Sequence, residues 1–352
     1  MELYNIIAQT PPIWLKGYGN DVDIVMCSRI RLARNIEGFL FPGRANQEEN
    51  AKTLEYISCR MQNVQDLQDY CYFSLKTMPE KDLYVLFERH LISKEHLKSS
   101  MPRGVFLKKD ESVSIMINEE DHLRIQVMHS GLHIQELWEE INALDDLLDE
   151  HLPYCFHEKY GYLTACPSNT GTGLRISVML HLPALSLSKQ MSNIQQELSK
   201  YHFCLRGLYG EGTIPLGDFF QLSNQKSLGL KETQMVAQIQ SLIPQVINYE
   251  KNAREKMLKN SQDILKKCRA SQKALCSEKS LSLHELMQHL SLIRLGSALD
   301  LVPLPLETAN FLFLFSLSAN LGRIVPVPME DEDEDKFRAQ VCKKIFNTKE
   351  KI

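Results

Sequence analysis

The sequence predicts an α+β protein in which antiparallel-type strands alternate with amphipathic helices and a helical region follows at the C-terminal end. Short segments in which apolar and polar residues alternate predict half-buried strands. Two of them, 113–117 and 123–127, are separated by a short polar stretch and therefore predict a hairpin. From Gln234 onward, apolar residues recur at helical spacing.

Composition places the chain among globular proteins. The 352 residues can bury a full core, and the net charge of −4 does not indicate a nucleic-acid surface. Nine cysteines without a Cys-x-x-Cys pair predict reduced thiols. The first residues carry no leader pattern, and the longest apolar stretch, 311–317, is too short to cross a bilayer. We therefore expect a cytoplasmic protein without nucleic-acid or membrane partners.

The segment 164–175 combines a cysteine, hydroxyl and amide side chains, two glycines and an arginine, and a strand is predicted directly after it. Such a loop suits a polyanion, because glycines let backbone N–H groups approach phosphate oxygens and a guanidinium adds a forked donor. It is not a Walker loop, since no Gly-Lys-Ser/Thr occurs, and Ile176 replaces the third glycine of a dinucleotide fingerprint. The alternative interpretation is a surface loop with a structural cysteine.

The first predicted strand, 23–35, carries two arginines on one face. Arg29 and Arg31 share one face by the two-residue period, and their guanidiniums repel each other unless an anion lies between them. The alternative interpretation is a solvated basic edge strand. The later apolar run 83–92 contains His90, whose default interpretation is a core or surface residue.

The tip of the hairpin, 118–122, carries three acids, and Arg124 lies just inside the second strand. Carboxylates beside an arginine could hold a cationic substrate next to an anionic one, although acidic tips are usually only solubilising. Arg206 ends another predicted strand, 201–206, before a glycine-rich loop with one acid at 207–213. The helices predicted between these strands are 47–64, 131–150 and 185–200.

Four predicted strands thus deliver five arginines, and two loops deliver carboxylates. The simplest explanation is a polyphosphate that lies across one face of a sheet, with Mg²⁺ neutralising part of its charge. The five arginines are Arg29, Arg31, Arg124, Arg175 and Arg206.

Four motifs in this order resemble the phosphagen (guanidino) kinase family, most closely its bacterial protein-arginine kinases of the McsB type. The motifs occupy 28–35, 118–125, 166–175 and 206–212, and the resemblance extends over about 23–230. It implies a curved antiparallel sheet flanked by helices in a catalytic domain at 1–254. A helical C-terminal domain at 255–352 would follow.

The resemblance implies ATP-dependent phosphorylation of arginine side chains in proteins, by in-line transfer of the γ-phosphoryl group to a guanidinium nitrogen. Mg²⁺ would be held through the ATP phosphates and water, with no protein metal site. Relatives that act on small guanidino compounds carry a helical N-terminal domain, whereas fewer than thirty residues precede the first arginine motif here. We therefore expect an open pocket that admits an exposed arginine of a protein substrate. The alternatives are a non-catalytic adaptor for phosphorylated or arginine-rich proteins and a kinase of free arginine.

The resemblance also assigns site residues. Glu120 and Glu211 would orient the substrate guanidinium, and Cys166, as a thiolate, would align it. Ile214 stands where relatives commonly have a second loop acid. The nucleotide-binding residues would be Cys27, Ser28, Arg29, Ile30, Arg31, His90, Arg124, Arg175, Ile176, Ser177, Val178, Met179, Arg206, Gly207, Leu208, Tyr209, Gly210 and Glu211.

In the C-terminal region, the family carries an Arg-Asp-x-x-Arg-Ala motif that binds phosphoarginine. The nearest match here is Glu334, Asp335, Arg338 and Ala339, so an acid replaces the leading arginine and we expect weak or no phosphoarginine binding. The acidic run 330–335 is expected to be a solvated loop. The resemblance further implies a homodimer through this domain, a role in protein quality control and the stress response, and room for an activator protein.

Overall fold

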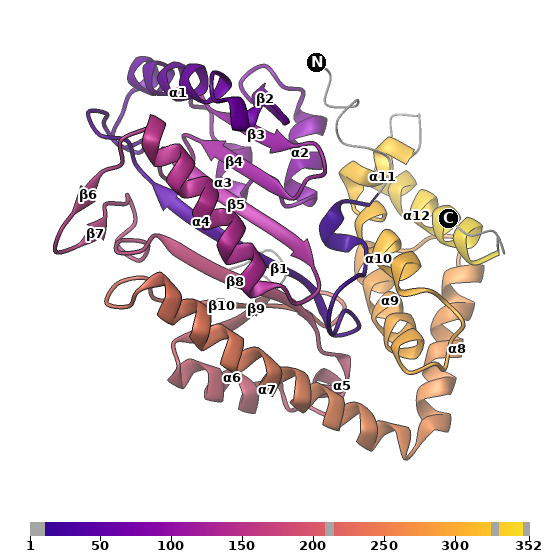
Figure 1. Cartoon of the computed structure of the whole chain (residues 1–352). Helices are drawn as coiled ribbons and strands as arrows, with labels where there is room; N and C mark the ends of the chain where they lie inside the picture. Colours follow the sequence, from indigo (N-terminus) through magenta and orange to yellow (C-terminus); the bar gives the residue numbers. More distant parts are fainter. Residues whose placement is uncertain (1–10, 208–214, 325–330, 348–352) are drawn as a thin grey trace.

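The computed structural model describes residues 11–207, 215–324 and 331–347 (Figure 1). An eight-stranded sheet has the strand order β2-β3-β4-β5-β1-β8-β10-β9, and each neighbouring pair is antiparallel. A cluster of helices from the C-terminal part of the chain packs beside this sheet. The α+β architecture predicted from the sequence is therefore confirmed.

The strands of the sheet include three that the alternation pattern does not predict, namely β2, β3 and β10. In β10 all six side chains are buried, so no period of two remains in the sequence. The strands are β1 (Val25–Arg34), β2 (Tyr70–Ser74), β3 (Gly104–Lys108), β4 (Val113–Ile117), β5 (Leu123–Ser130), β8 (Leu174–His181), β9 (Phe203–Gly207) and β10 (Phe219–Asn224), with a small separate hairpin of β6 (Phe156–His157) and β7 (Gly161–Tyr162).

The helices fall into two groups, one that covers the sheet and one that forms the C-terminal cluster. The first group is α1 (Gln47–Gln62), α2 (Glu80–Glu88), α3 (Lys94–Lys98), α4 (Ile134–His151), α5 (Pro183–Leu187), α6 (Met191–Lys200) and α7 (Glu232–Leu258), with 3-10 turns at Ile13–Leu15 and Gln65–Leu67. The second group is α8 (Ser261–Ser277), α9 (Leu283–Ala298), α10 (Leu306–Phe315), α11 (Ser318–Ile324) and α12 (Asp331–Asn347).

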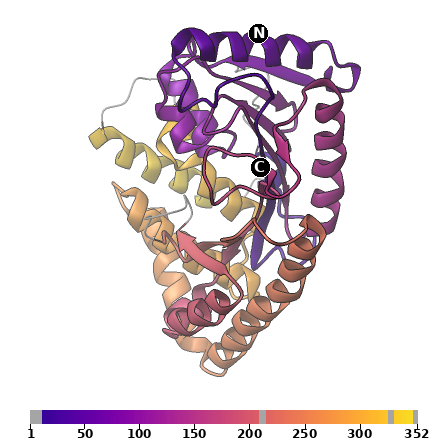
Figure 2. The ribbon, with the colours of Figure 1, turned by 90° about the vertical axis from the view of Figure 1, so that its left-hand side faces the viewer.

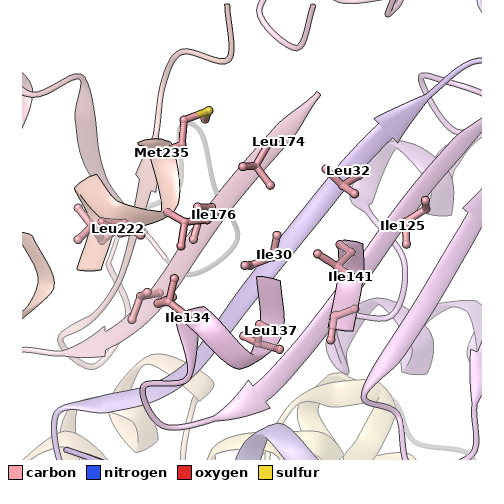
Figure 3. Packing of buried hydrophobic residues seen from close by; sticks show 14 of the residues in the cluster. Ile30, Leu32, Ile125, Ile134, Leu137, Ile141, Leu174, Ile176, Leu222 and Met235 are labelled. Carbon is pink, nitrogen blue, oxygen red and sulfur yellow. The ribbon is translucent and has the colours of Figure 1, made fainter. Parts of the chain in front are cut away.

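One face of the sheet is apolar and carries the main core. Ile30, Ile125, Ile176 and Leu222 lie on neighbouring strands, and each is at most 1% exposed. Side chains of α4 and α7 pack against them, as Figure 3 shows for the middle of the sheet. Burying such a side chain contributes about 1.5–3 kcal/mol. This face fixes which way every alternate side chain of β1, β5 and β8 points.

The opposite face of the sheet is divided among three surroundings. At one end, helices of the C-terminal cluster pack over Cys27, Met128 and Met179, together with Trp14. Over β3 and β4, α2 contributes to a smaller apolar cluster. Figure 2 shows α4 and α7 along one side of the sheet, α1 across the top and the yellow C-terminal helices on the other side. Between the two apolar clusters, polar side chains occupy this face.

Two buried arginines attach the C-terminal cluster to the rest of the molecule. Arg89 donates to both carboxylate oxygens of Glu111, at 2.6 and 2.7 Å, and to Asn320 of α11 at 3.2 Å. Arg294 of α9 donates to two backbone carbonyl oxygens just before β1, at 2.7 and 2.8 Å. Because these buried donors are satisfied across the junction, the contact is polar as well as apolar.

Two expectations from the sequence are wrong. The helix predicted at 185–200 is interrupted: Ser188 donates its hydroxyl back to the Ala184 carbonyl at 2.7 Å, and Lys189 adopts a left-handed conformation with φ 58°, so α5 ends before α6 begins. The acidic run is not a loop from residue 331 onward, because α12 begins at Asp331. Acidic residues are favourable at a helix N-terminus, which explains the difference.

Arg34 and Asp145 form a buried ion pair between β1 and α4. Hydrogen bonds of 2.6 to 3.1 Å join them, and their side chains are 2% and 9% exposed. We expect Asp145→Ala to lower the free energy of unfolding by about 3–5 kcal/mol, because it leaves a buried guanidinium unpaired. Urea unfolding measures this. Lys52→Ala, which breaks an exposed pair on α1, is the control and should leave the midpoint unchanged. An unchanged midpoint for Asp145→Ala would contradict the argument.

Candidate active site

Five arginines lie on the face of the sheet opposite the main core. The strand register places Arg31 of β1 directly opposite Arg175 of β8, and it places Arg29, Arg124 and Arg206 on the same face. All five are partly exposed. The structure therefore brings together, on four strands, the arginines that the sequence pattern selects.

Arg31 and Arg175 set two like charges directly opposite each other, which is unfavourable by itself. Burial, followed by the charges of Arg29, Arg124 and Arg175, lowers the pKa of Arg31 well below its ordinary value, and Glu119 opposes this effect. The Nε atom of Arg31 is buried and has no hydrogen-bond partner among the described residues. This face consequently offers cationic donors to an anionic ligand.

Arg29 is oriented by two neutral side chains. Its Nε donates to the Ser177 hydroxyl at 3.2 Å, and its terminal nitrogen donates to the Gln221 side-chain oxygen at 2.7 Å. Burial, with repulsion from Arg124 and Arg175, lowers the pKa of Arg29 to about 10. Neutral partners fix the guanidinium without cancelling its charge. The sequence pattern misses Gln221, because it lies on the fully buried strand β10.

His90 lies next to the arginine face, at the end of α2. Its ring contacts the Trp14 ring at a centroid distance of 5.2 Å, and its carbonyl oxygen accepts a hydrogen bond from Gln126 at 2.7 Å. Burial, and then the charges of Arg29 and Arg31, lowers its pKa to about 3. The imidazole is therefore neutral at physiological pH, and the same charges show that it is close to the arginines.

The two glutamates at the hairpin tip have different surroundings. Both oxygens of Glu119 accept hydrogen bonds from Arg124 at 2.9 Å. Burial would raise the pKa of Glu119, but Arg124 and Ser93 outweigh burial and bring it to about 2. Glu120 remains at the surface, where partial burial and then the charges of Glu119 and Asp121 raise its pKa. Glu119 is thus paired with Arg124, whereas Glu120 is exposed to solvent.

Two buried side chains connect the hairpin tip to the cysteine loop, which is the segment 164–173 before β8. Asp121 accepts hydrogen bonds from the Ala165 backbone N–H and from Asn35 Nδ2, both at 2.6 Å. Asn35 also donates to the Leu163 carbonyl oxygen at 3.0 Å and accepts from the N–H of His122 at 2.9 Å. Glu120 directly precedes Asp121 in the chain, and Cys166 directly follows Ala165. The hydrogen bond between Asp121 and Ala165 therefore brings the segments that carry the two proposed catalytic side chains to the same region.

The cysteine loop is shaped by packing. Cys166 is half-buried, and its Sγ lies 3.0 Å from the Ser168 hydroxyl. Gly171 and Gly173 have positive φ, and a Cβ atom would lie 2.6 Å from a backbone oxygen of Ser227 or Ala33, respectively. The loop approaches neighbouring backbone so closely at these two positions that only glycine fits there. The two glycines are therefore explained by packing, and no bound ligand is needed to account for them.

The remaining nucleotide-binding candidates are distributed unevenly. Ile30, Ile176 and Val178 point into the apolar core, so only their backbone could contact a ligand. Cys27 and Met179 lie under the C-terminal helices. Ser28 is buried, donates to the Gly131 carbonyl at 2.7 Å and does not lie on the arginine face, whereas Gly207 ends β9 beside Arg206. Leu208, Tyr209, Gly210, Glu211 and Ile214 lie outside the described residues.

The C-terminal motif is engaged within the chain. Arg338 is 2% exposed and donates to the carbonyl oxygens of Ser316 and Leu281, at 2.9 and 3.0 Å. Its remaining donors meet Asp335 and Glu334, and Ala339 is fully buried. The guanidinium is therefore a structural bridge between α12 and its neighbours.

The described residues carry neither a cluster of metal-binding side chains nor a membrane-spanning helix. Residues 11–207, 215–324 and 331–347 contain no group of three or more histidine, cysteine or acidic side chains that could hold a metal ion. No helix in the same part of the chain is long and apolar enough to cross a membrane.

Two family models match the chain. The ATP:guanido phosphotransferase C-terminal catalytic domain matches residues 52–253, and the protein-arginine kinase McsB C-terminal domain matches residues 261–352. The protein-arginine kinase of Halothermothrix orenii is 38% identical over 86% of this chain and 86% of its own length. That of Symbiobacterium thermophilum is 39% identical over 85% of this chain and 86% of its own length.

Solved structures with a similar fold include other guanidino kinases. The duplicated taurocyamine kinase from Schistosoma mansoni, with bound transition state analog components, matches with a TM-score of 0.61 and 28% identity over 68% of this chain and 34% of its own. Lombricine kinase matches with a TM-score of 0.59 and 26% identity over 67% of this chain and 69% of its own.

Asp121 should control the exposure of Cys166. We expect Asp121→Ala to raise the alkylation rate of Cys166 roughly tenfold, because the loop loses a charge-assisted hydrogen bond worth about 1.5–3 kcal/mol. Peptide mass spectrometry after timed alkylation measures each thiol separately. Asp121→Asn, which keeps an acceptor oxygen, should have a smaller effect, and the exposed Cys59 should react at an unchanged rate. Equal Cys166 rates in wild type and Asp121→Ala would show that the loop is held by other contacts.

Proposed function

The chain belongs to the protein-arginine kinases of the ATP:guanido phosphotransferase family, and we propose that its arginine face is the nucleotide site. The protein phosphorylates arginine side chains of proteins, with ATP as the phosphoryl donor. The observation that carries the site assignment is the pairing of Arg31 with Arg175, two cations that face each other on neighbouring strands. A triphosphate would bring several negative charges to this cationic face.

In this proposal, the arginines neutralise charge that develops on the transferred phosphoryl group. Guanidiniums donate in fixed forks, so a set of them can hold the phosphates in line with an attacking nitrogen. His90, whose pKa is lowered by burial and then by the charges of Arg29 and Arg31, would contact the nucleotide beside the phosphates. Gln221 and Ser177 act as positioning residues, since they orient Arg29.

The substrate guanidinium would lie between the hairpin tip and the cysteine loop. Glu120 would accept hydrogen bonds from it and orient it, Cys166 would align it, and Glu211 would approach from the loop after β9. Phosphoryl transfer needs mainly such positioning and charge neutralisation. Asp121 and Asn35 hold the two protein segments in register, as the hydrogen bonds described above indicate.

Mg²⁺ belongs to the proposal as a partner of ATP. The ion would be held by phosphate oxygens and water. When bound, it would neutralise part of the phosphate charge. The arginine face would supply the remaining positive charge.

The direct test incubates the protein with labelled ATP, free arginine and an arginine-rich protein. We expect acid-labile label on the protein substrate, and Arg175→Ala should lower kcat by about 10²–10³, because one donor to the developing charge is lost. Arg269→Ala, an exposed arginine on α8, is the matched control. Label only on free arginine would instead indicate a free-arginine kinase, and binding of arginine-rich protein without label would indicate an adaptor. Full turnover in a folded Arg175→Ala variant would contradict the nucleotide-site assignment.

Glu120 should leave a signature in the pH dependence. Its pKa is raised, so as the pH falls the carboxylate is lost sooner than from an ordinary glutamate with a pKa of 4.5. Activity that needs the carboxylate is therefore present above this pKa and lost below it. We expect kcat/KM to fall on the acid side in wild type, and Glu120→Gln to lower kcat and abolish that limb while ATP affinity is kept. Loss of ATP affinity with unchanged kcat would reverse the assignment.

The two matched family models support a division into two domains near residue 254, inside α7. The proposal also includes a homodimer formed through the C-terminal domain, and an activator protein as a further partner. We further propose that the C-terminal motif does not sense phosphoarginine, because Arg338 is already saturated by oxygens of its own chain and lies beside two acids.

Titration of free phosphoarginine into the full chain by calorimetry should therefore show no tight binding. Arg338→Lys should lower the melting temperature, since it removes a buried multidentate donor, whereas Lys336→Ala, at an exposed position on the same helix, should not. Tight phosphoarginine binding that survives Lys336→Ala and disappears in Arg338→Lys would contradict this part of the proposal.

A further inference from the structure

A pocket of about 380 Å³ lies at the β9 edge of the sheet. The end of α6, the start of β9, the loop between β10 and α7, and the first turns of α7 form its walls. Figure 1 shows where α6, β9, β10 and α7 lie in the fold. The residues that matter for its chemistry are Lys200, Tyr201, His202, Lys226, Leu228 and Met235.

The pocket is cationic. Lys200 and Lys226 both line it at exposed positions, and Lys226 Nζ lies 3.2 Å from His202 Nε2. Of the described residues that line the pocket, none is acidic, although the whole chain has more acids than bases. Two lysines without an acid among the lining residues attract an anionic group and reject a guanidinium.

The same pocket carries exposed apolar side chains. Tyr201 is 60% exposed and Leu228 is 54% exposed. Large apolar side chains that stay in contact with water beside a pocket are typical of surfaces that dock another protein. Together with the lysines, they suit a peptide segment in which an acidic residue has an apolar neighbour.

The pocket adjoins the loop that carries Cys166. Ser227 lies in the chain between the two lining residues Lys226 and Leu228. Its hydroxyl is within hydrogen-bond distance of the carbonyl oxygens of Ser168 and Thr170, at 2.7 and 3.0 Å. The segment that carries Lys226 and Leu228 is therefore fastened by hydrogen bonds to the loop that carries Cys166.

We propose that this pocket binds an acidic side chain of the protein substrate, a few residues away from the arginine that is phosphorylated. The inference rests on the proposed function and adds a recognition element to it. The carboxylate pairs with Lys226 and Lys200, and the apolar neighbour covers Leu228. Substrate choice then depends on the sequence around the arginine as well as on its exposure.

Matched peptides test the proposal. Each peptide contains one arginine and a Glu, a Gln or a Lys placed two to six residues away, and KM and kcat are measured for phosphoarginine formation. At the favoured spacing we expect KM to be about three- to tenfold lower for the Glu peptide than for the Lys peptide, with similar kcat. Lys226→Glu should abolish or invert this preference. Lys76→Glu, an exposed lysine just after the other edge strand β2, is the control. Equal KM values at every spacing, or a Glu preference that persists in Lys226→Glu, would overturn the proposal.

A binding measurement separates this proposal from the proposed function. A labelled Glu peptide in which the arginine is replaced by lysine cannot be phosphorylated on a guanidinium, and its affinity is measured by fluorescence anisotropy. We expect weaker binding to Lys226→Glu than to Lys76→Glu. Equal binding to the two variants would overturn the pocket assignment. If binding depends on Lys226 and no peptide is phosphorylated, the pocket stands and the proposed function fails.

Discussion

The facing arginines on β1 and β8 are the constraint on which the rest of the site depends. A direct pair of like charges in a sheet is unfavourable, so the register that creates it must be fixed by something else. Here the opposite face of the same strands supplies Ile30 and Ile176, both buried in the main core. A slip of one residue would expose this apolar face, and its burial therefore holds Arg31 and Arg175 in place.

Packing also determines how the acids at the hairpin tip are arranged. The hairpin between β4 and β5 carries three acids at its tip, and each of them has different surroundings. Glu119 neutralises Arg124, Asp121 accepts a hydrogen bond from the cysteine loop, and Glu120 is exposed to solvent. Cationic donors and an accessible acid thus lie on adjoining parts of the molecule, which is the arrangement required to hold an anion and a cation side by side.

The alternating strands and the arginines on them could be predicted from the sequence, because a period of two survives wherever one face is apolar. The strand β10 could not, since both of its faces are buried, and Gln221 was missed with it. The link through Asn35 and Asp121 depends on contacts between residues 86 positions apart, which no local pattern contains. The prediction of a single helix at 185–200 failed for a local reason. Ser188 donates its hydroxyl to the carbonyl oxygen of Ala184, and the following Lys189 has a left-handed backbone conformation.

Three consecutive residues, Glu88, Arg89 and His90, connect the C-terminal cluster to the arginine face. Glu88 accepts hydrogen bonds from the backbone N–H groups of Ala319 and Asn320, both at 2.9 Å, and Arg89 donates to the Asn320 side chain. The next residue, His90, has a left-handed backbone with φ 60° and lies close to the arginine face. A histidine in this conformation needs support from its surroundings, because the left-handed region is unfavourable for a residue with a Cβ atom. The contacts of Glu88 and Arg89 with α11 provide that support, so the packing of the C-terminal helices helps to set the position of His90.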